Sequence, residues 1–100
     1  MTFDEYMALL EPLDEAERKV LRGTVEEIVF MEAKMKEYKK LPFVSVNPRN
    51  PAFQKSTVAA KLYKETSAGY MNAVRILLSA LHKVDENAEN ELLRKLEDFS

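Results

Sequence analysis

The stretch that decides the fold is DEAERKVLRGTVEEIVFMEAKMKEYKK, residues 14–40. Its apolar and small side chains recur every three or four residues, which is the spacing of one face of a helix. That face consists of Leu21, Thr24, Ile28, Met31, Met35 and Tyr38. Asp14 followed by Glu17 is an N-cap signal, and Gly23 alone weakens the helical pattern. We therefore expect one continuous helix over residues 14–40.

A second helix of similar length is predicted over residues 56–84, with Ser56 or Thr57 as its N-cap. The same spacing recurs in Ala59, Tyr63, Thr66, Tyr70, Ala73 or Val74, Leu77, Leu81 and Val84. Between the two helices, residues 41–55 hold three of the four prolines and no helical period, which predicts a connector. Within it, residues 43–46 suit a short extended segment. Two long helices joined in this way predict an antiparallel helical hairpin.

Shorter helices are expected at both ends, over residues 1–11 and 87–99. Thr2 with Glu5 has capping-box spacing, and Glu11 before Pro12 ends the first of these helices. The predicted class is therefore all-α, with residues 1–100 forming a single helical domain.

Composition excludes several classes of site. The chain has no cysteine, so disulfides, thiolate metal sites and a cysteine nucleophile are impossible. No apolar run approaches the ~20 residues needed to span a bilayer, and the acidic N-terminus lacks the basic region of a signal peptide. We expect no membrane association, no cofactor and a cytoplasmic protein, in the bacterial host cytoplasm if a phage encodes it.

Many apolar residues lie off the two core-facing stripes. A two-helix hairpin cannot bury all of them, and large exposed apolar surface is uncommon in monomers. This predicts a homo-oligomer whose interface contains Val25, Val29, Phe30, Leu62, Ile76 and Leu78. The C-terminal helix has its own apolar side, which we expect to dock a partner through Leu92, Leu93, Leu96 and Phe99.

The net charge of −2 conceals a segregation of charge along the chain. Residues 1–37 carry ten acids and five bases, residues 38–84 one acid and eight bases, and residues 85–100 six acids and two bases. The bases that cluster around the connector are Lys39, Lys40, Arg49, Lys55, Lys61 and Lys64. At one tip of a hairpin they are suited to DNA phosphates. The alternative is that they neutralise acidic residues of the same chain or of a neighbouring subunit.

No pattern in the chain predicts catalysis. Glycine-rich phosphate loops, serine elbows and metalloprotease helix motifs are absent. Glu26, Glu27, Glu32 and Glu37 indicate a solvated helix face, or partners for Lys61, Lys64 and Arg75 across the hairpin. The single histidine, His82, fits the end of a helix better than a metal site. We expect a protein that is not an enzyme and binds no metal.

The order of the segments resembles a known family. A long charged helix is followed by the Asn-Pro connector VNPRNPAFQKST and by AAKLYKETSAGYMNAVRILLSAL. Over residues 13–84 this arrangement is similar to one group of bacteriophage terminase small subunits. The resemblance implies a non-catalytic, ring-forming subunit that recognises double-stranded viral DNA and recruits the ATP-driven large subunit. The alternative is a helical homo-oligomeric interaction module with no nucleic-acid role.

Overall fold

The computed structural model describes residues 1–47 and 49–99, with side chains for all of these except residues 45–47, 50–55 and 99. Its elements follow the order α1 (Phe3–Leu9), α2 (Glu15–Lys39), β1 (Val44–Asn47), β2 (Asn50–Ser56), α3 (Val58–His82) and α4 (Glu86–Phe99). The chain is mainly helical with four helices, which confirms the predicted helical class. The paired strands are an addition to that prediction.

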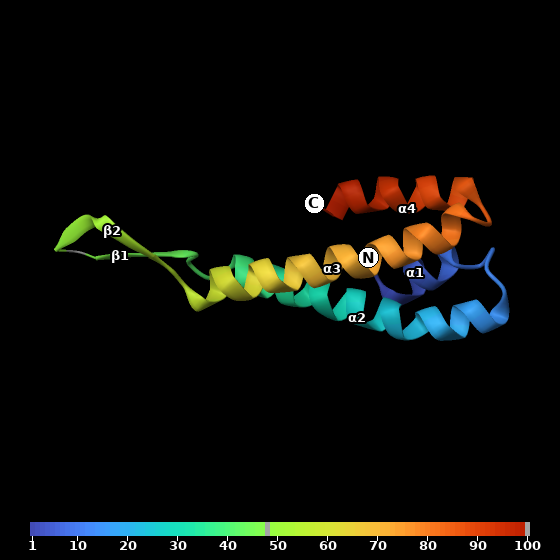
Figure 1. Cartoon of the computed structure of the whole chain (residues 1–100), viewed down its shortest axis with the longest axis horizontal. Helices are drawn as coiled ribbons and strands as arrows, with labels where there is room; N and C mark the ends of the chain where they lie inside the picture. The colour runs from blue at the N-terminus through green and yellow to red at the C-terminus, as the bar shows by residue number, and fades with distance from the viewer. Residues whose placement is uncertain (48, 100) are drawn as a thin grey trace.

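Helices α2 and α3 run side by side in opposite directions and form the central layer (Figure 1). Each begins at a side chain that accepts a hydrogen bond from the first turn: Asp14 from the amide of Glu17 at 2.8 Å, and Thr57 from the amide of Ala60 at 3.2 Å. The fully buried side chains between the helices include Ile28, Leu77 and Leu81. A Cβ added at Gly69 would lie 3.4 Å from Met31 Sδ, so these two residues lie at the same level along the layer.

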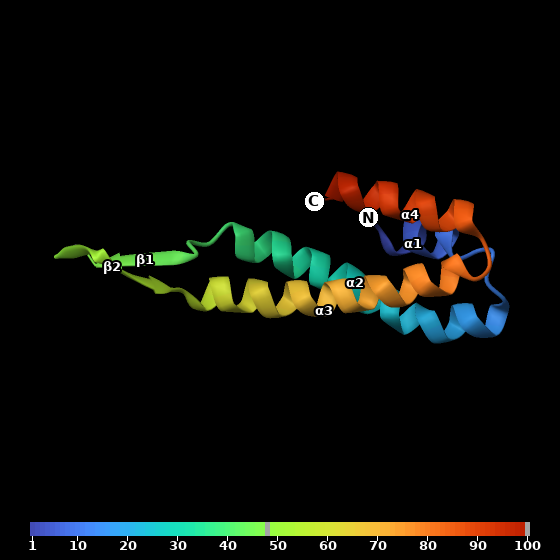
Figure 2. The same ribbon diagram turned by 45° about the horizontal axis from the view of Figure 1, so that its top comes forward.

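Helices α1 and α4 cover one side of this layer. α1 packs against α2 and α4, and α4 packs against α3, as Figure 2 shows from a turned view. Tyr6, Leu10 and Leu92 of these two segments are fully buried and extend the core. The opposite side of the α2–α3 layer receives no helix from the described part of the chain.

The predicted connector folds as a two-stranded antiparallel ribbon. Val44 pairs with Ser56, Ser45 with Lys55 and Val46 with Gln54. A register shift follows Val46, before the pairing of Asn47 with Asn50 that closes the ribbon. Valine favours extended backbone and asparagine favours turns, which is the local reason for a ribbon here.

The molecule is elongated, with extents of 60 × 21 × 18 Å. The ribbon projects from one end of the helical layer, and α1, α4 and the loops that join them to it lie toward the other end (Figure 1). We call residues 33–69, which include the ribbon and the adjoining ends of α2 and α3, the basic arm. The rest of the chain is the body.

Candidate nucleic-acid interface

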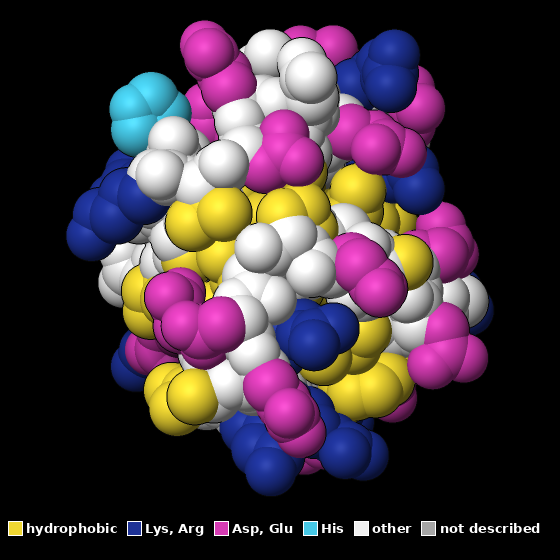
Figure 3. All heavy atoms as spheres, turned by 90° about the vertical axis from the view of Figure 1, so that its right-hand side faces the viewer, with side chains coloured by type: hydrophobic (Ala, Val, Ile, Leu, Met, Phe, Trp, Pro, Cys, Tyr) yellow, Lys and Arg dark blue, Asp and Glu magenta, His cyan; other side chains and the backbone are white. Residues whose placement is uncertain are grey.

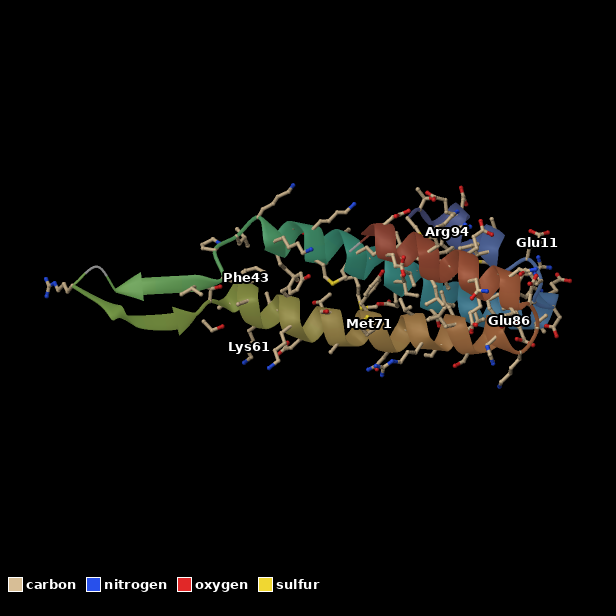
Figure 4. The ribbon with its side chains drawn as sticks, turned by 90° about the horizontal axis from the view of Figure 1, so that it is seen from above. Glu11, Phe43, Lys61, Met71, Glu86 and Arg94 are labelled. Carbon is tan, nitrogen blue, oxygen red and sulfur yellow. The ribbon has the colours of Figure 1, made fainter. Side chains whose placement is uncertain are left out.

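The basic arm concentrates positive charge at one end of the molecule. It carries eight lysines and arginines and two glutamates, whereas the body carries seven bases and fifteen acids. Glu11 and Glu86 lie at the end farthest from the ribbon (Figure 4). Figure 3 views that end and shows acidic side chains spread over it, with apolar side chains visible between them. The two ends of the molecule therefore differ in electrostatic character.

The structure brings the predicted basic residues into this arm. Lys39 and Lys40 end α2, Lys61 and Lys64 lie in the first two turns of α3, and all four are exposed. Lys61 points away from the helical layer (Figure 4). Arg49 is exposed in the turn between the two strands.

The remaining predicted cation, Lys55, belongs to β2, and its side chain lies outside the described residues.

The base of the ribbon is held by contacts that its own sequence supplies. The Thr57 hydroxyl donates to the Pro42 carbonyl at 2.6 Å, and the Thr57 amide donates to the Phe43 carbonyl at 3.1 Å. The Phe43 ring lies 5.3 Å from the Tyr63 ring at an interplanar angle of 49°. These contacts join the start of β1 to the start of α3, so the ribbon is anchored where it leaves the helices.

Within the arm, acidic residues neutralise little of the positive charge. Glu37 accepts from Lys34 at 3.3 Å, an exposed pair of the kind that contributes little energy. Lys39 Nζ lies 5.7 Å from the centre of the Tyr63 ring, which orders the side chain without removing its charge. The lysines at the base of the ribbon are thus positioned to meet an anion.

The arrangement of the arm suits the binding of phosphate groups better than it suits catalysis. Exposed ammonium and guanidinium groups spread over a narrow projection contact a polyanion, and a two-stranded ribbon has dimensions that a DNA major groove admits. Across the residues that the structure describes, no group of three or more His, Asp or Glu side chains is arranged to hold a metal ion. His82 Nδ1 instead lies 3.1 Å from Glu89.

A buried polar cluster in the body was missed by the sequence analysis. Glu32 is only 4% exposed, which contradicts its prediction as a solvated residue or a partner of Lys61, Lys64 or Arg75. It accepts hydrogen bonds from the hydroxyls of Tyr6 and Tyr70, the latter at 3.5 Å, and from the Met1 amine at 3.2 Å. The signal was its position: it follows Ile28 by four residues and precedes Met35 by three, which places it on the core-facing side of α2.

Burial of this cluster changes the acidity of the two tyrosines. Removal from water raises the pKa of Tyr70 to about 12, with a further contribution from nearby Glu32. The pKa of Tyr6 is raised further, first by burial and then by its hydrogen bond to Glu32. Both hydroxyls therefore stay protonated as donors to the carboxylate at neutral pH. The cluster ties α1 to α2 and α3, and it lies where the body meets the arm, since Glu32 and Tyr70 adjoin residues 33 and 69.

Two of the predicted interface residues are wrong because they lie in the core. Val25 and Leu92 are 0% exposed within a single chain, so neither is available to another molecule. Both belong to the hydrophobic core that the four helices form together, an arrangement that the sequence pattern had not placed.

The other predicted interface residues differ in exposure. Val29, Leu78 and Leu96 are partly buried against the core. Phe30, Leu62, Ile76 and Leu93 are exposed. Phe99 ends α4, and its side chain lies outside the described residues. Exposed apolar surface thus remains on both α2 and α3 after the chain has folded.

None of the described helices has a segment long and apolar enough to cross a bilayer. Comparison with models of known protein families, with curated proteins and with solved structures finds no match to this chain.

Proposed function

We propose that this protein binds double-stranded DNA through its basic arm and performs no catalysis. One observation carries the proposal: eight bases and only two acids occupy a narrow projection from a body that is strongly acidic. Solubility alone does not require this segregation of charge. Segregated charge does orient a polyanion, which the arm attracts and the body repels. The ribbon supports the duplex form as ligand, since its dimensions suit a groove.

The test is a salt-dependent binding measurement with a matched control. Lys40→Glu/Lys64→Glu reverses two exposed charges on the arm, and Lys19→Glu/Arg94→Glu reverses two exposed charges on the body. Each variant changes the net charge equally. The arm variant is expected to bind a DNA duplex roughly 100-fold more weakly at low salt, and the slope of log K against log salt to fall in magnitude by about two.

The control variant is expected to bind like the unmodified protein, within about threefold. Equal weakening in both variants would mean that net charge, and not the arm, governs binding. Absence of binding by the unmodified chain at ~50 mM salt would remove the DNA-binding proposal altogether.

In a more specific form, we propose that DNA binding serves packaging of a phage genome, in the manner of a terminase small subunit. The support is the order of helix, Asn-Pro connector and helix over residues 13–84, together with the basic charge at that connector. The exposed part of α4, around Leu93, is then a docking surface for the ATP-driven large subunit. Co-purification of the chain with the terminase large subunit encoded beside it, lost in Leu93→Asp, tests this form separately.

A second candidate is a helical homo-oligomeric interaction module with no nucleic-acid role. The observation in its favour is the apolar surface left exposed on α2 and α3, including Val20, Phe30 and Ile76. In this case the basic arm would pair with the acidic body of a neighbour. An oligomer that dissociates in high salt, and with which DNA does not compete, would favour this candidate.

A further inference from the structure

The side of the α2–α3 layer that α1 and α4 leave uncovered carries exposed apolar residues. Val20 is 77% exposed and Ile76 51%, and Leu62, which is 38% exposed, lies farther toward the arm. Two adjoining depressions lie here, one lined by Val20, Leu21 and Ala80 and the other by Ile76 and Ala80, with Glu17 in both and no residue of α1 or α4 in either. We call this surface the open face. Exposed apolar residues beside such depressions between two helices are typical of a protein interface.

Charged residues mark the two ends of the open face. Glu17 and Lys83 border the depression at the body end. Toward the arm, Lys34 follows Val20 by fourteen residues and Glu65 precedes Ile76 by eleven, which are close to whole numbers of helical turns. On this face α2 presents Glu17, Glu27 and Lys34, and α3 presents Glu65, Arg75 and Lys83. The outermost acid and base of each helix stand in opposite order along the molecule. Lys34 Nζ also lies 3.3 Å from Glu37 of its own chain.

The spacing of these charges has a common centre. On α2 the midpoint between Glu17 and Lys34 falls between residues 25 and 26, and on α3 the midpoint between Glu65 and Lys83 is residue 74. Met31 and Gly69, which are in contact distance, lie five or six residues from these midpoints in the direction of the arm. The two midpoints are therefore at the same level along the layer.

We infer that the open face binds the open face of a second copy of this chain in an antiparallel, two-fold arrangement centred at that level. A two-fold axis there places α2 against α2 and α3 against α3 of the second copy. Glu17 then faces Lys34 of the second copy, and Glu65 faces its Lys83, which gives four reciprocal pairs with Ile76 of both copies near the axis. A parallel pairing also matches local charges, but it places arm beside arm and acidic body beside acidic body. The antiparallel pairing places each basic arm beside an acidic body.

The charged residues of this pairing are distinct from the exposed lysines of the proposed DNA contact, so variants of the two sets test dimerisation and DNA binding separately. The pairing also differs from a head-to-tail ring, in which two different surfaces meet. Two residues oppose it. Glu27 lies two turns from Val20, close to the two-fold axis, and faces its own copy. Arg75, which lines the depression with Ile76, is one residue from the α3 midpoint and also lies near its own copy. Glu27→Gln is therefore expected to strengthen the dimer.

The first measurement is the mass of the full chain in solution across a concentration series. A dimer is expected, and Ile76→Asp is expected to raise its dissociation constant by at least about tenfold. Met71→Asp is the matched control, since Met71 is 48% exposed on the same helix but lines a groove toward α4. Circular dichroism verifies that both variants remain helical. A monomer at every concentration, or equal weakening by both variants, would overturn the inference.

The orientation is tested with single cysteines, which the chain otherwise lacks. In the antiparallel dimer two copies of Ala73→Cys are offset by only about 3 Å along the helices, and two copies of Leu62→Cys by about 36 Å. Mild oxidation is expected to cross-link the Ala73→Cys dimer at least tenfold faster. Comparable cross-linking at both positions would overturn the antiparallel arrangement.

Charge exchange provides an independent check on the orientation. Glu65→Lys is expected to weaken the dimer, and adding Lys83→Glu to restore it, because these residues face each other between copies. Adding Lys34→Glu instead restores the dimer only in the parallel arrangement. Rescue by Lys34→Glu and not by Lys83→Glu would therefore contradict the inference.

Discussion

The body and the basic arm are stabilised in different ways. The body buries large apolar side chains between four helices and encloses a carboxylate with its hydrogen-bond donors. The arm adds a two-stranded ribbon to the adjoining ends of α2 and α3. The Phe43–Tyr63 contact and the bonds of Thr57 hold this ribbon at its base, and two strands alone are marginally stable in water. The difference separates folding from ligand contact: the body determines whether the chain folds, and the arm provides the charge that we propose binds DNA.

The largest expected effect comes from removing a core side chain of the body. Leu77→Ala deletes a fully buried side chain between α2 and α3 and is expected to lower the free energy of unfolding by about 2–5 kcal/mol. DNA affinity of the remaining folded protein should not change. Urea denaturation measures the first quantity, and a binding titration at a temperature where the variant is folded measures the second.

The counterpart of the core substitution is a deletion of the ribbon in the arm. Because the Thr57 amide and Phe43 carbonyl lie 3.1 Å apart, residues 44–56 are replaceable by a short glycine–serine linker. This deletion is expected to change the free energy of unfolding by less than about 1 kcal/mol and to weaken DNA binding strongly. A large loss of stability on excision of the ribbon would show that the two regions are not independent.

A smaller effect is expected from the polar cluster inside the body. Glu32→Ala leaves the Tyr6 hydroxyl and the Met1 amine without their acceptor and is expected to cost about 3 kcal/mol of stability. Glu32→Gln retains an acceptor oxygen and should cost less, which distinguishes loss of the hydrogen bonds from loss of volume. Denaturant titration with the exposed-residue control Glu26→Ala measures both. If the Glu32 and Glu26 variants are equally stable, the cluster does not stabilise the body.

The helical part of this fold was accessible from the sequence because its signals are local. Asp14 and Thr57 are cap residues at the starts of α2 and α3, and the spacing of Ile28, Leu77 and Leu81 marks their buried sides. The strand pairing was not accessible, since proline and asparagine in residues 41–55 indicate a turn without specifying a register. Local signals also do not state which helix covers which face, and this is why Val25 and Leu92 were expected at an interface and lie in the core.

The local nature of the sequence signals also explains why one candidate site was predicted and the other was missed. The clustering of arm lysines follows from chain order alone, because residues near a connector stay near it in space. The environment of Glu32 depends instead on the hydroxyls of Tyr6 and Tyr70, which are distant in sequence and are brought to it by folding. Its helical position was a signal of burial, but Glu32 was predicted to be solvated or paired, because the partners of a charged residue at a core position are identified only by the three-dimensional arrangement.

The smallest expected effect that distinguishes the two regions is the dependence of the free energy of unfolding on alkaline pH. The pKa of Tyr70 is about 12 in the folded body, against about 10 for an unfolded tyrosine. Between these values the folded state holds a proton that the unfolded state has lost, so the free energy of unfolding falls as pH rises through this window, by up to about 1.4 kcal/mol per pH unit for this group. The contribution is fully present below pH ~10.

Tyr70→Phe removes the titrating hydroxyl, and with it the 3.5 Å hydrogen bond to Glu32 and the hydrogen bond to Tyr6. In denaturant titrations from pH 9 to 12, the free energy of unfolding should therefore decline less steeply for Tyr70→Phe than for the unmodified chain. Removal of the ribbon should leave this difference unchanged. Equally steep declines with and without Tyr70 would contradict the burial of its hydroxyl.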